Sequence, residues 1–258
     1  MTTYLDRILE RHREVAATDV RSLDRLIEDA RRLPPTRGFR AALATTDHLA
    51  VIAEIKRRSP SKGDLNADLD PGAMAAAYEQ GGASCLSVLT DEEFFGGSVA
   101  DLLSARGACS LPVIRKDFTV SLHDVVDARL MGADCVLLIA AALEPSELAE
   151  MHAMAIELGL DALVEIHDEA ELEVAMGADA SLVGVNQRDL VTFRVDHERA
   201  VRMAGVIPDS CVKVAESGVR GGGDARSLEA AGYHAVLVGE TLVTSGDPAA
   251  SIRELIGR

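Results

Sequence analysis

A loose repeat, which begins near residue 81 and continues to the end of the chain, constrains the fold more than any other feature. In each copy a glycine ends a helical pattern, two or three small or polar residues follow, and a short run rich in β-branched residues begins. Glycine is expected where a helix stops in the left-handed conformation. The copies follow one another at about 25 residues, enough for one strand and one helix. The marker glycines are Gly82, Gly107, Gly132, Gly159, Gly177, Gly205 and Gly232.

The short runs after these glycines predict strands that are buried on both faces. They are apolar without a clean alternation, as in a parallel sheet that helices cover. With the run AVIAEIKRR at the front, the predicted strands are residues 51–57, 84–89, 112–116, 135–140, 162–166, 181–185, 211–215 and 235–239. This alternation predicts an α/β fold, a single (β/α)8 TIM barrel. A doubly wound sheet is the alternative, but the first strand–helix unit lacks a GxGxxG motif followed by an acidic residue.

Amphipathic segments between the runs, such as SELAEMHAMAIELG, predict the helices of the barrel. Three segments carry start signals, Asp70-Pro71, Glu144-Pro145-Ser146 and Asp247-Pro248. Residues 1–50 precede the repeat and predict three helices, in YLDRILERHREVAAT, DVRSLDRLIEDARRL and GFRAALA. This segment is too short and polar to form its own core. We therefore expect residues 1–258 to form one barrel domain, with 1–50 as a helical extension packed on it.

Charge and composition exclude several classes of function. A net charge of -16 and a pI near 4.8 argue against a nucleic-acid partner. No stretch reaches the roughly 18 apolar residues of a membrane span, and charges interrupt the N-terminus where a signal peptide would be apolar. We therefore expect a cytoplasmic protein without a membrane partner. We also expect a monomer, with a homodimer as the alternative, because no apolar surface stripe is evident.

The cysteines and histidines predict neither a disulfide nor a metal site. The four cysteines are widely spaced without a CxxC pair, which favours buried, reduced thiols. The seven histidines show no HxH or HExxH spacing of the kind that binds zinc. We expect no metal in the site.

Lysine is rare in this chain, and its positions are informative. Of 26 basic residues only Lys56, Lys62, Lys116 and Lys213 are lysines, and the rest are arginines. A lysine ammonium is compact and gives up a proton when it is desolvated, so a retained lysine marks a place where arginine will not serve. Chance is the competing explanation. Lys213 lies in the middle of a predicted strand, and we interpret it as structural.

Polar and ionic residues interrupt the buried runs at one end of the predicted barrel. Active sites of such barrels form at the carboxyl ends of the strands. An unpaired buried charge costs on the order of several kcal/mol, so five strands with such residues at one end indicate a functional site. Glu54 and Lys56 are two residues apart and share a face of their strand. The candidates are Glu54, Lys56, Lys116, Glu165, Asn186, Arg188, Glu216 and Ser217.

The segments after the last two strands predict a phosphate site. ESGVRGGGD and VGET each place small residues before a helix, and barrels often bind phosphate with these two loops. The candidates are Gly218, Gly239, Glu240 and Thr241. Lysines, an arginine, carboxylates and a phosphate site together suit a phosphorylated small molecule that undergoes acid–base chemistry without a metal.

Over almost its whole length the chain resembles the indole-3-glycerol phosphate synthase family. The motifs, in order, are AEIKRRSPSKG, LTDEEFFGGS, PVIRKDF, GADCVLLI, LVEIH, VNQRDL, VAESGV and LVGET. The resemblance implies ring closure of 1-(o-carboxyphenylamino)-1-deoxyribulose 5-phosphate, with loss of carbon dioxide and water, in tryptophan biosynthesis. It implies no cofactor.

The resemblance also implies roles for the reacting groups. Lys116 would be the general acid that protonates the substrate carbonyl, and Glu165 the acid/base of the dehydration. Lys56 and Arg188 would contact the substrate carboxylate, with Lys56 as a possible second proton donor. Glu54 would keep the lysines charged and oriented.

Other residues would bind the substrate. The resemblance implies sugar contacts from Asn186, Glu216 and Ser217, phosphate contacts from Ser59, Gly218, Gly239 and Thr241, and an aryl pocket of Phe95, Phe118 and Leu137. The basic loop SPSKG would cover the site, and we hypothesise that Lys62 swings in with it. Two positions depart from the family pattern. Gln187 stands where the family more often has Asn, which leaves its role open, and Thr241 replaces a Ser but keeps the hydroxyl.

Three other functions remain as alternatives. Another phosphosugar barrel, such as phosphoribosylanthranilate isomerase, uses an acid/base pair without both Glu-x-Lys on the first strand and the third-strand lysine. A Schiff-base aldolase would use Lys116 as a nucleophile, which borohydride trapping would reveal. A binding protein without catalysis would lose no activity when Lys116 is replaced.

Overall fold

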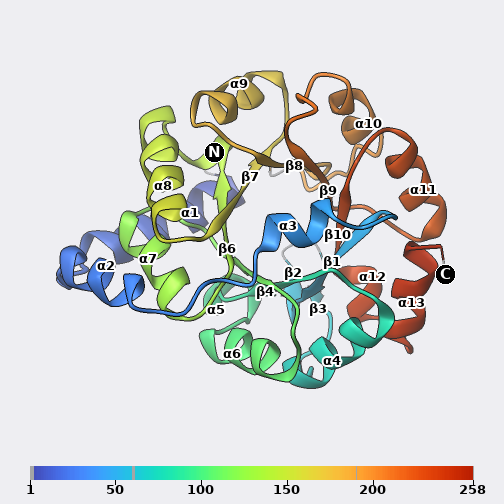
Figure 1. Ribbon diagram of the computed structural model, residues 1–258, viewed down its shortest axis with the longest axis horizontal. Coiled ribbons are helices and arrows are strands. Elements are labelled where there is room, and N and C mark those ends of the chain that lie inside the picture. The colour runs from blue at the N-terminus through green and yellow to red at the C-terminus, as the bar shows by residue number, and fades with distance from the viewer. Residues whose placement is uncertain (1–2, 60–61, 190, 258) are drawn as a thin grey trace.

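The computed structural model describes residues 3–59, 62–189 and 191–257, and these form a closed parallel barrel (Figure 1). The barrel strands are β1 (Ala50–Ile55), β4 (Cys85–Leu89), β5 (Val113–Lys116), β6 (Cys135–Ile139), β7 (Asp161–Ile166), β8 (Leu182–Asn186), β9 (Val212–Glu216) and β10 (Ala235–Val238). All eight lie within two residues of their predicted bounds. Because β1 pairs in parallel with both β4 and β10, the sheet has no edge, and the doubly wound alternative is wrong.

Helices surround the barrel and connect its strands. They are α4 (Pro71–Gly81), α5 (Glu92–Phe95), α6 (Val99–Ala108), α7 (Leu122–Leu130), the 3-10 turn η1 (Ala140–Ala142), α8 (Pro145–Glu157), α9 (Glu169–Gly177), α10 (Arg199–Ala204), α11 (Gly222–Ala230), α12 (Glu240–Val243) and α13 (Pro248–Leu255). The three predicted start signals are confirmed: Asp70, Glu144 and Asp247 are N-caps, each followed by proline in the first turn.

The marker glycines do not all share the left-handed conformation that we expected. Gly82, Gly132, Gly159 and Gly232 have positive φ and end their helices as predicted. Gly107 lies within α6 and Gly205 has a φ of -79°, so neither fits the expectation. Gly177 is the last residue of α9, and Asp179, two residues later, takes the positive φ instead. A short polar side chain tolerates this conformation because it can bond locally to the backbone.

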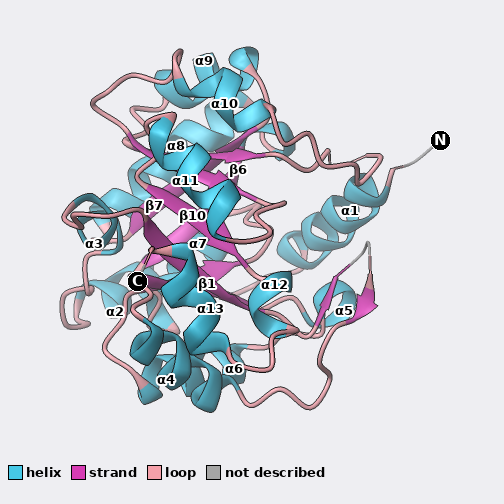
Figure 2. Cartoon of the chain, turned by 90° about the vertical axis from the view of Figure 1, so that its right-hand side faces the viewer, coloured by secondary structure: helices cyan, strands magenta, loops and turns pink. Residues whose placement is uncertain are grey.

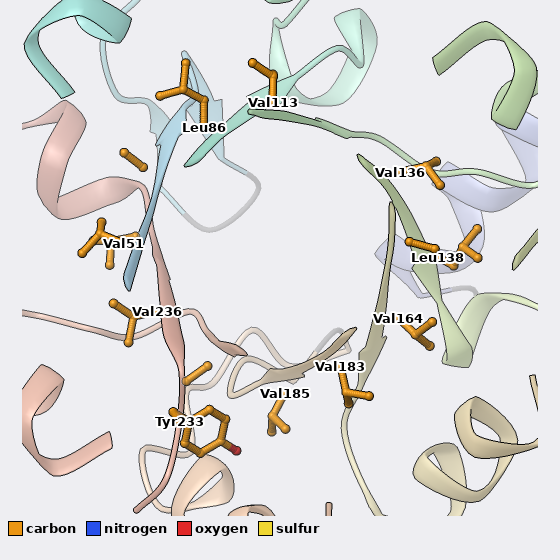
Figure 3. Close-up of a cluster of buried hydrophobic side chains, with 14 of the residues drawn as sticks. Val51, Leu86, Val113, Val136, Leu138, Val164, Val183, Val185, Tyr233 and Val236 are labelled. Atoms are coloured by element: carbon orange, nitrogen blue, oxygen red, sulfur yellow. The ribbon is translucent and has the colours of Figure 1, made fainter. Parts of the chain in front are cut away.

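The strand residues divide into two apolar layers, which explains why the sequence shows no alternation. One set fills the barrel interior, including Ile52, Ile114 and Leu163. The other set packs between the sheet and the helices, and Figure 3 shows side chains such as Val51 and Val164 pointing away from the barrel centre. Side chains alternate between these faces with a period of two, but both faces are buried and therefore apolar.

Three helices precede the first strand; the first and third lie at opposite ends of the barrel (Figure 2), and the second packs on the outside against α7. They are α1 (Tyr4–Ala17), α2 (Leu23–Arg31) and α3 (Phe39–Ala44). Phe39 and Leu43 of α3 join the interior cluster, so this helix covers the amino end. At the carboxyl end, α1 lies near α5 and near the hairpin of β2 (Arg58–Ser59) and β3 (Gly63–Asp64).

Lys213 has the structural place that its mid-strand position predicted. Its ammonium donates to the Ala204 carbonyl at the end of α10, at 3.0 Å, and lies 3.2 Å from an Asp209 carboxylate oxygen. The four cysteines are free thiols; Cys109 is partly exposed, which corrects the expectation that all are buried. Among the described residues, none of the helices has the length and hydropathy to cross a bilayer.

Candidate functional site

A cavity of about 390 Å³ opens at the carboxyl end of the barrel, opposite the amino end that α3 covers. All the catalytic, substrate-binding and phosphate-binding residues that we predicted from the sequence line this cavity. They come from seven strands or the segments that follow them, together with Phe95 of α5. Pro60 and Ser61 of the SPSKG loop lie outside the described residues.

Lys116 occupies the centre of the charged groups. It ends β5, its side chain is 16% exposed, and its ammonium lies 3.3 Å from a Glu165 oxygen and 3.7 Å from a Glu216 oxygen. Burial by itself would lower the pKa of this lysine, but the charges of Glu165, Glu216 and Glu54 outweigh it and raise the pKa well above the usual range. The raised pKa favours the protonated, cationic form of Lys116.

Glu54 and Lys56 share a face, as their spacing predicted. The Lys56 ammonium lies 2.5 Å from one Glu54 oxygen, and the Ser87 hydroxyl donates to the other at 3.3 Å. Burial would raise the pKa of Glu54, but the charges of Lys56 and Lys116 lower it. Glu54 is therefore a buried carboxylate that interacts with both lysines at once.

Glu165 and Glu216 form a coupled pair on adjoining sides of Lys116. Asn186 donates an amide hydrogen bond to Glu165 at 2.9 Å. Burial would raise the pKa of Glu165, but Lys116 and His167 lower it. Burial and the neighbouring Glu165 charge raise the pKa of Glu216 to about 8. Near neutral pH the pair therefore holds one proton, on Glu216, beside an ionised Glu165.

Two glycines make room for these buried carboxylates. A Cβ on Gly184 of β8 would lie 2.0 Å from a Glu216 oxygen, and a Cβ on Gly239 would lie 2.5 Å from a Glu54 oxygen. Gly239 was predicted for phosphate contact, whereas Gly184 was missed. Its only sequence signal is a glycine inside a strand, which often marks close approach by another group.

Gly184→Ala is expected to lower kcat/KM by about tenfold or more, because Glu216 must leave its position and a 1 Å displacement can cost about a hundredfold. Gly177→Ala is the matched control, since a Cβ there meets nothing within 4 Å. Steady-state kinetics and thermal melts of both variants check this. Equal kcat/KM for the two variants would show that Glu216 tolerates displacement.

Glu216→Gln is expected to reduce the pH dependence of stability. The pKa of Glu216 is raised to about 8 in the folded chain, while an unfolded glutamate titrates near about 4.3. The contribution of Glu216 to the free energy of unfolding therefore decreases as the pH rises from about 4.3 to about 8. Glutamine does not titrate, so in the variant this decrease is absent. We expect Tm of the variant relative to the parent to increase between about pH 5 and pH 8. The increase should be at least about 2–4 °C, the shift that about 1 kcal/mol gives at this size. A constant difference would contradict the raised pKa.

A backbone turn after β9 brings two further candidates to the cavity. Ser217 and Gly218 both have positive φ, of 64° and 77°. Gln187, whose role the sequence left open, is buried, and its side-chain amide donates to the Ser217 carbonyl at 2.8 Å. A Cβ on Gly218 would lie 2.5 Å from a Val195 methyl. Gln187 therefore supports this turn from behind, and Gly218 is required for space as well as for conformation.

The phosphate candidates surround the side of the cavity formed by β1, β9 and β10. The Ser59 hydroxyl is buried and, among the described residues, has no hydrogen-bond partner. The Thr241 hydroxyl donates to the Val219 carbonyl at 3.1 Å. Across the mouth, the exposed Lys62 ammonium lies 3.6 Å from a Glu240 carboxylate oxygen. Among the described residues, the Ser59 hydroxyl is therefore available to donate a hydrogen bond to an anion, whereas Lys62 must first leave Glu240.

The aryl candidates form the opposite side. The rings of Phe95 and Phe118 lie 6.2 Å apart at their centroids, and Leu137 projects from β6 into the barrel interior. Arg188 follows β8, and its guanidinium donates to the Phe193 carbonyl at 3.2 Å. A flat apolar ring with an anionic substituent would fit between these groups.

Sequence reasoning missed a group of polar residues beside this aryl side. His12 of α1, Asp91 after β4 and Asp117 after β5 place their ligand-type atoms within 4.8 Å of one another. Such a trio could hold a metal ion, but His12 already hydrogen-bonds Asp91 at 2.9 Å, and Asp117 pairs with Arg115 at 3.0 Å. The residues are 79 and 26 positions apart, so no local spacing could reveal them.

Comparisons with known proteins agree on one family. The family model described as indole-3-glycerol phosphate synthase matches residues 5–255. A curated relative from Streptomyces coelicolor, indole-3-glycerol phosphate synthase 2, is 51% identical over 92% of this chain and 92% of its own length. Another, indole-3-glycerol phosphate synthase of Rhodopirellula baltica, is 44% identical over 98% of this chain and 99% of its own.

Solved structures support the fold at much lower identity. 3-Hexulose-6-phosphate synthase from Salmonella typhimurium aligns with a TM-score of 0.64 at 12% identity, over 81% of this chain and 97% of that one. Thiamine phosphate pyrophosphorylase from Pyrococcus furiosus aligns with a TM-score of 0.60 at 15% identity, over 80% of this chain and 93% of that one. At such identities the likeness concerns the barrel alone.

Proposed function

The chain belongs to the indole-3-glycerol phosphate synthase family of carboxy-lyases in tryptophan biosynthesis, and we propose that it closes the indole ring in the cavity described above. The substrate is 1-(o-carboxyphenylamino)-1-deoxyribulose 5-phosphate, and the reaction releases carbon dioxide and water. The observation that carries the assignment to this cavity is the position of Lys116, a mostly buried lysine whose ammonium lies within 3.7 Å of carboxylate oxygens of Glu165 and Glu216.

Lys116 acts as the general acid of ring closure. As the aryl carbon attacks the substrate carbonyl, negative charge develops on the carbonyl oxygen. A protonated lysine in a water-poor cavity stabilises that charge and transfers its proton when the oxygen becomes basic enough. The ionised carboxylates of Glu165 and Glu54 keep the lysine charged before this step. Decarboxylation follows because the ring carbon that attacked the carbonyl is now quaternary, and the ring regains its aromaticity when carbon dioxide leaves that carbon.

Glu165 acts as the acid/base of the dehydration that follows. It is ionised in the empty cavity and lies beside both Lys116 and Asn186. An ionised carboxylate accepts the proton that must leave the ring system while a hydroxyl departs as water. Lys56, 2.5 Å from Glu54, is placed to protonate that hydroxyl or to bind the substrate carboxylate. Its partner in carboxylate binding is Arg188.

The remaining residues bind and orient the substrate. Phe95, Phe118 and Leu137 hold the aryl ring. Protonated Glu216 donates a hydrogen bond to a sugar hydroxyl, with Asn186 and Ser217 nearby. Phosphate binds opposite the aryl pocket, where the unpartnered Ser59 hydroxyl supports the assignment. Backbone N–H groups of Gly218, Gly239, Glu240 and Thr241 add donors there, and Lys62 exchanges Glu240 for the phosphate.

The proposed function is tested by mixing the protein with the anilino-deoxyribulose phosphate and following indole fluorescence in buffer treated with a chelator. We expect a continuous rise in fluorescence with equimolar release of carbon dioxide. Consumption of the substrate without an indole signal would contradict ring closure and favour an isomerase. A covalent adduct at Lys116 after borohydride treatment would contradict the general-acid role and favour Schiff-base chemistry.

We further propose that residues 1–258 form a single domain that acts as a cytoplasmic monomer. The contacts of α3 with the barrel interior support the domain, since Phe39 and Leu43 would otherwise expose apolar surface. Biosynthesis of an amino acid supports the location. Light scattering in solution would test the monomer, and a dimer mass would replace it with the alternative.

A further inference from the structure

His12 reaches from α1 to two loops of the barrel mouth. Its Nε2 lies 2.9 Å from an Asp91 oxygen and 3.8 Å from an Asp117 oxygen. The imidazole side chain is 18% exposed, and both aspartate side chains are 4% exposed. Asp91 follows β4 and Asp117 follows β5, so one ring connects the N-terminal extension to two neighbouring barrel segments.

Each aspartate in turn fixes one phenylalanine of the aryl pocket. Asp91 is the N-cap of α5 and accepts the Phe94 and Phe95 backbone N–H groups at 2.6 and 3.1 Å. Asp117 accepts the Phe118 N–H at 2.9 Å. The His12 ring also packs against Phe118, with centroids 5.6 Å apart.

A positive charge on His12 balances the carboxylates that surround it. Asp91 and Asp117 face the ring directly, and Asp124 of α7 contributes from farther away. Arg115 of β5 is the cation on the barrel side, and it pairs with Asp117 at 3.0 Å. Two mostly buried carboxylates share this space, so a neutral imidazole would leave the charge of Asp91 without a cation and the two anions in mutual repulsion.

We propose that protonated His12 is a positioning residue, which holds the Asp91 and Asp117 segments together so that Phe95 and Phe118 pack against the aryl ring of the substrate. This inference deepens the proposed function and rests on it for the identity of the ligand. Among the described residues, Asp91 and Asp117 line the cavity and His12 does not, so His12 acts through the two aspartates. Its loss therefore weakens binding more than it slows the chemical steps.

The charge of His12 makes the binding of the aryl ring depend on pH. Burial would lower the pKa of His12, but the hydrogen bond to Asp91 and the charges of Asp117 and Asp91 raise it above the ordinary value. The protonated form therefore persists through neutral pH and is lost as the pH rises through the raised pKa. KM should increase on the alkaline side while kcat changes little.

Two variants separate charge from bulk. His12→Lys keeps a cation at alkaline pH, and His12→Gln removes it while keeping a hydrogen-bond donor. Between about pH 7 and pH 9 we expect the KM of the parent to rise about fivefold, the low end of coupling between neighbouring groups. KM should be high throughout for His12→Gln and low throughout for His12→Lys. Dividing the KM of each variant by the KM of the parent at the same pH removes the effect of substrate ionisation.

Arg13→Gln is the matched control on the same helix. Among the described residues, Arg13 bonds Glu147 of α8 at 3.0 Å and the Ala142 carbonyl at 3.2 Å, and neither Asp91 nor Asp117. Its KM should equal that of the parent at each pH. A KM increase as large as in His12→Gln would overturn the proposal in favour of general docking of α1. Equal pH profiles for His12→Lys and the parent, or a KM that changes when metal is chelated, would overturn it as well.

A readout without turnover separates this inference from the proposed function. NMR titration of the His12 ring should give a lower pKa in Asp117→Asn than in the parent, and anthranilate, the aryl half of the substrate, should bind more weakly to His12→Gln. If the parent shows no turnover, the proposed function fails while these two measurements still decide the role of His12. An unchanged pKa together with unchanged anthranilate affinity would overturn it.

Discussion

Lys116→Met is expected to lower kcat by about two to four orders of magnitude, the usual contribution of a positioned general acid. Methionine preserves much of the length of the side chain but can neither donate a proton nor stabilise an alkoxide. Substrate binding should change less, because the aryl and phosphate contacts come from other residues. Carbon dioxide release and indole fluorescence should slow together, since Lys116 acts before both. Stopped-flow fluorescence and carbon dioxide assays on the same samples check this.

Lys62→Met is the control for Lys116→Met. Lys62 is also a cavity lysine, but its side chain is 60% exposed and its partner Glu240 is 40% exposed. An exposed ion pair contributes about 0–1 kcal/mol to stability. Because Lys62 is proposed to contact the phosphate and not the reacting atoms, we expect KM to rise in this variant while kcat changes by less than about tenfold. Thermal melts should accompany both variants, because Lys116→Met leaves buried carboxylates with less compensation. Turnover of Lys116→Met at the parental rate would refute the proposed mechanism.

Glu165→Gln is expected to separate the two product signals. The amide cannot accept the proton that leaves during dehydration, whereas Lys116 still promotes ring closure. In a single turnover, release of carbon dioxide should therefore run ahead of indole fluorescence, and steady-state kcat should fall by about two to four orders of magnitude. Rapid-quench sampling of both signals measures the lag.

Glu171→Gln provides the comparison for Glu165→Gln. Glu171 lies on α9 and bonds the His167 ring at 3.0 Å, outside the residues that line the cavity. It should show no lag between the two signals. If carbon dioxide release and indole fluorescence slow equally in Glu165→Gln, then Glu165 acts before decarboxylation. The assignment of Lys116 to ring closure and Glu165 to dehydration would then be wrong.

The sequence predicted the barrel and the charged residues of the cavity because both depend on local periodicity and strand ends, whereas Ser59 and the aryl pocket followed from the family resemblance. Glu54 and Lys56 illustrate this, since a spacing of two on a strand requires a shared face, and their 2.5 Å contact confirms it. Lys116, Glu165 and Glu216 are brought together by closure alone, because every parallel strand ends at the same rim. The glycine rule was less reliable, and Gly107 and Gly205 show that a glycine near a helix end need not be left-handed.

The sequence could not reveal relations that depend on which side chains meet across the barrel. Gly184 reads as an ordinary strand glycine until Glu216 is seen in the space that a Cβ would fill. Gln187 reads as a departure from a motif until its amide is found on the Ser217 carbonyl. In both cases the partner lies on another strand, and no spacing along the chain encodes the contact.

The sequence by itself determined the α/β alternation, the end of the barrel that carries the site and the charged residues at the strand ends that line it, because these follow from backbone periodicity and the cost of buried charge. Only the tertiary structure decided the protonation of those residues and the place of the N-terminal helix. Glu165 on β7 and Glu216 on β9 are the same residue type on two strands that β8 separates, yet their pKa values shift in opposite directions. Burial raises both pKa values, but at Glu165 the charge of Lys116 helps to outweigh it, whereas at Glu216 the charge of Glu165 adds to it. Both relations depend on distances between strands and not along the chain.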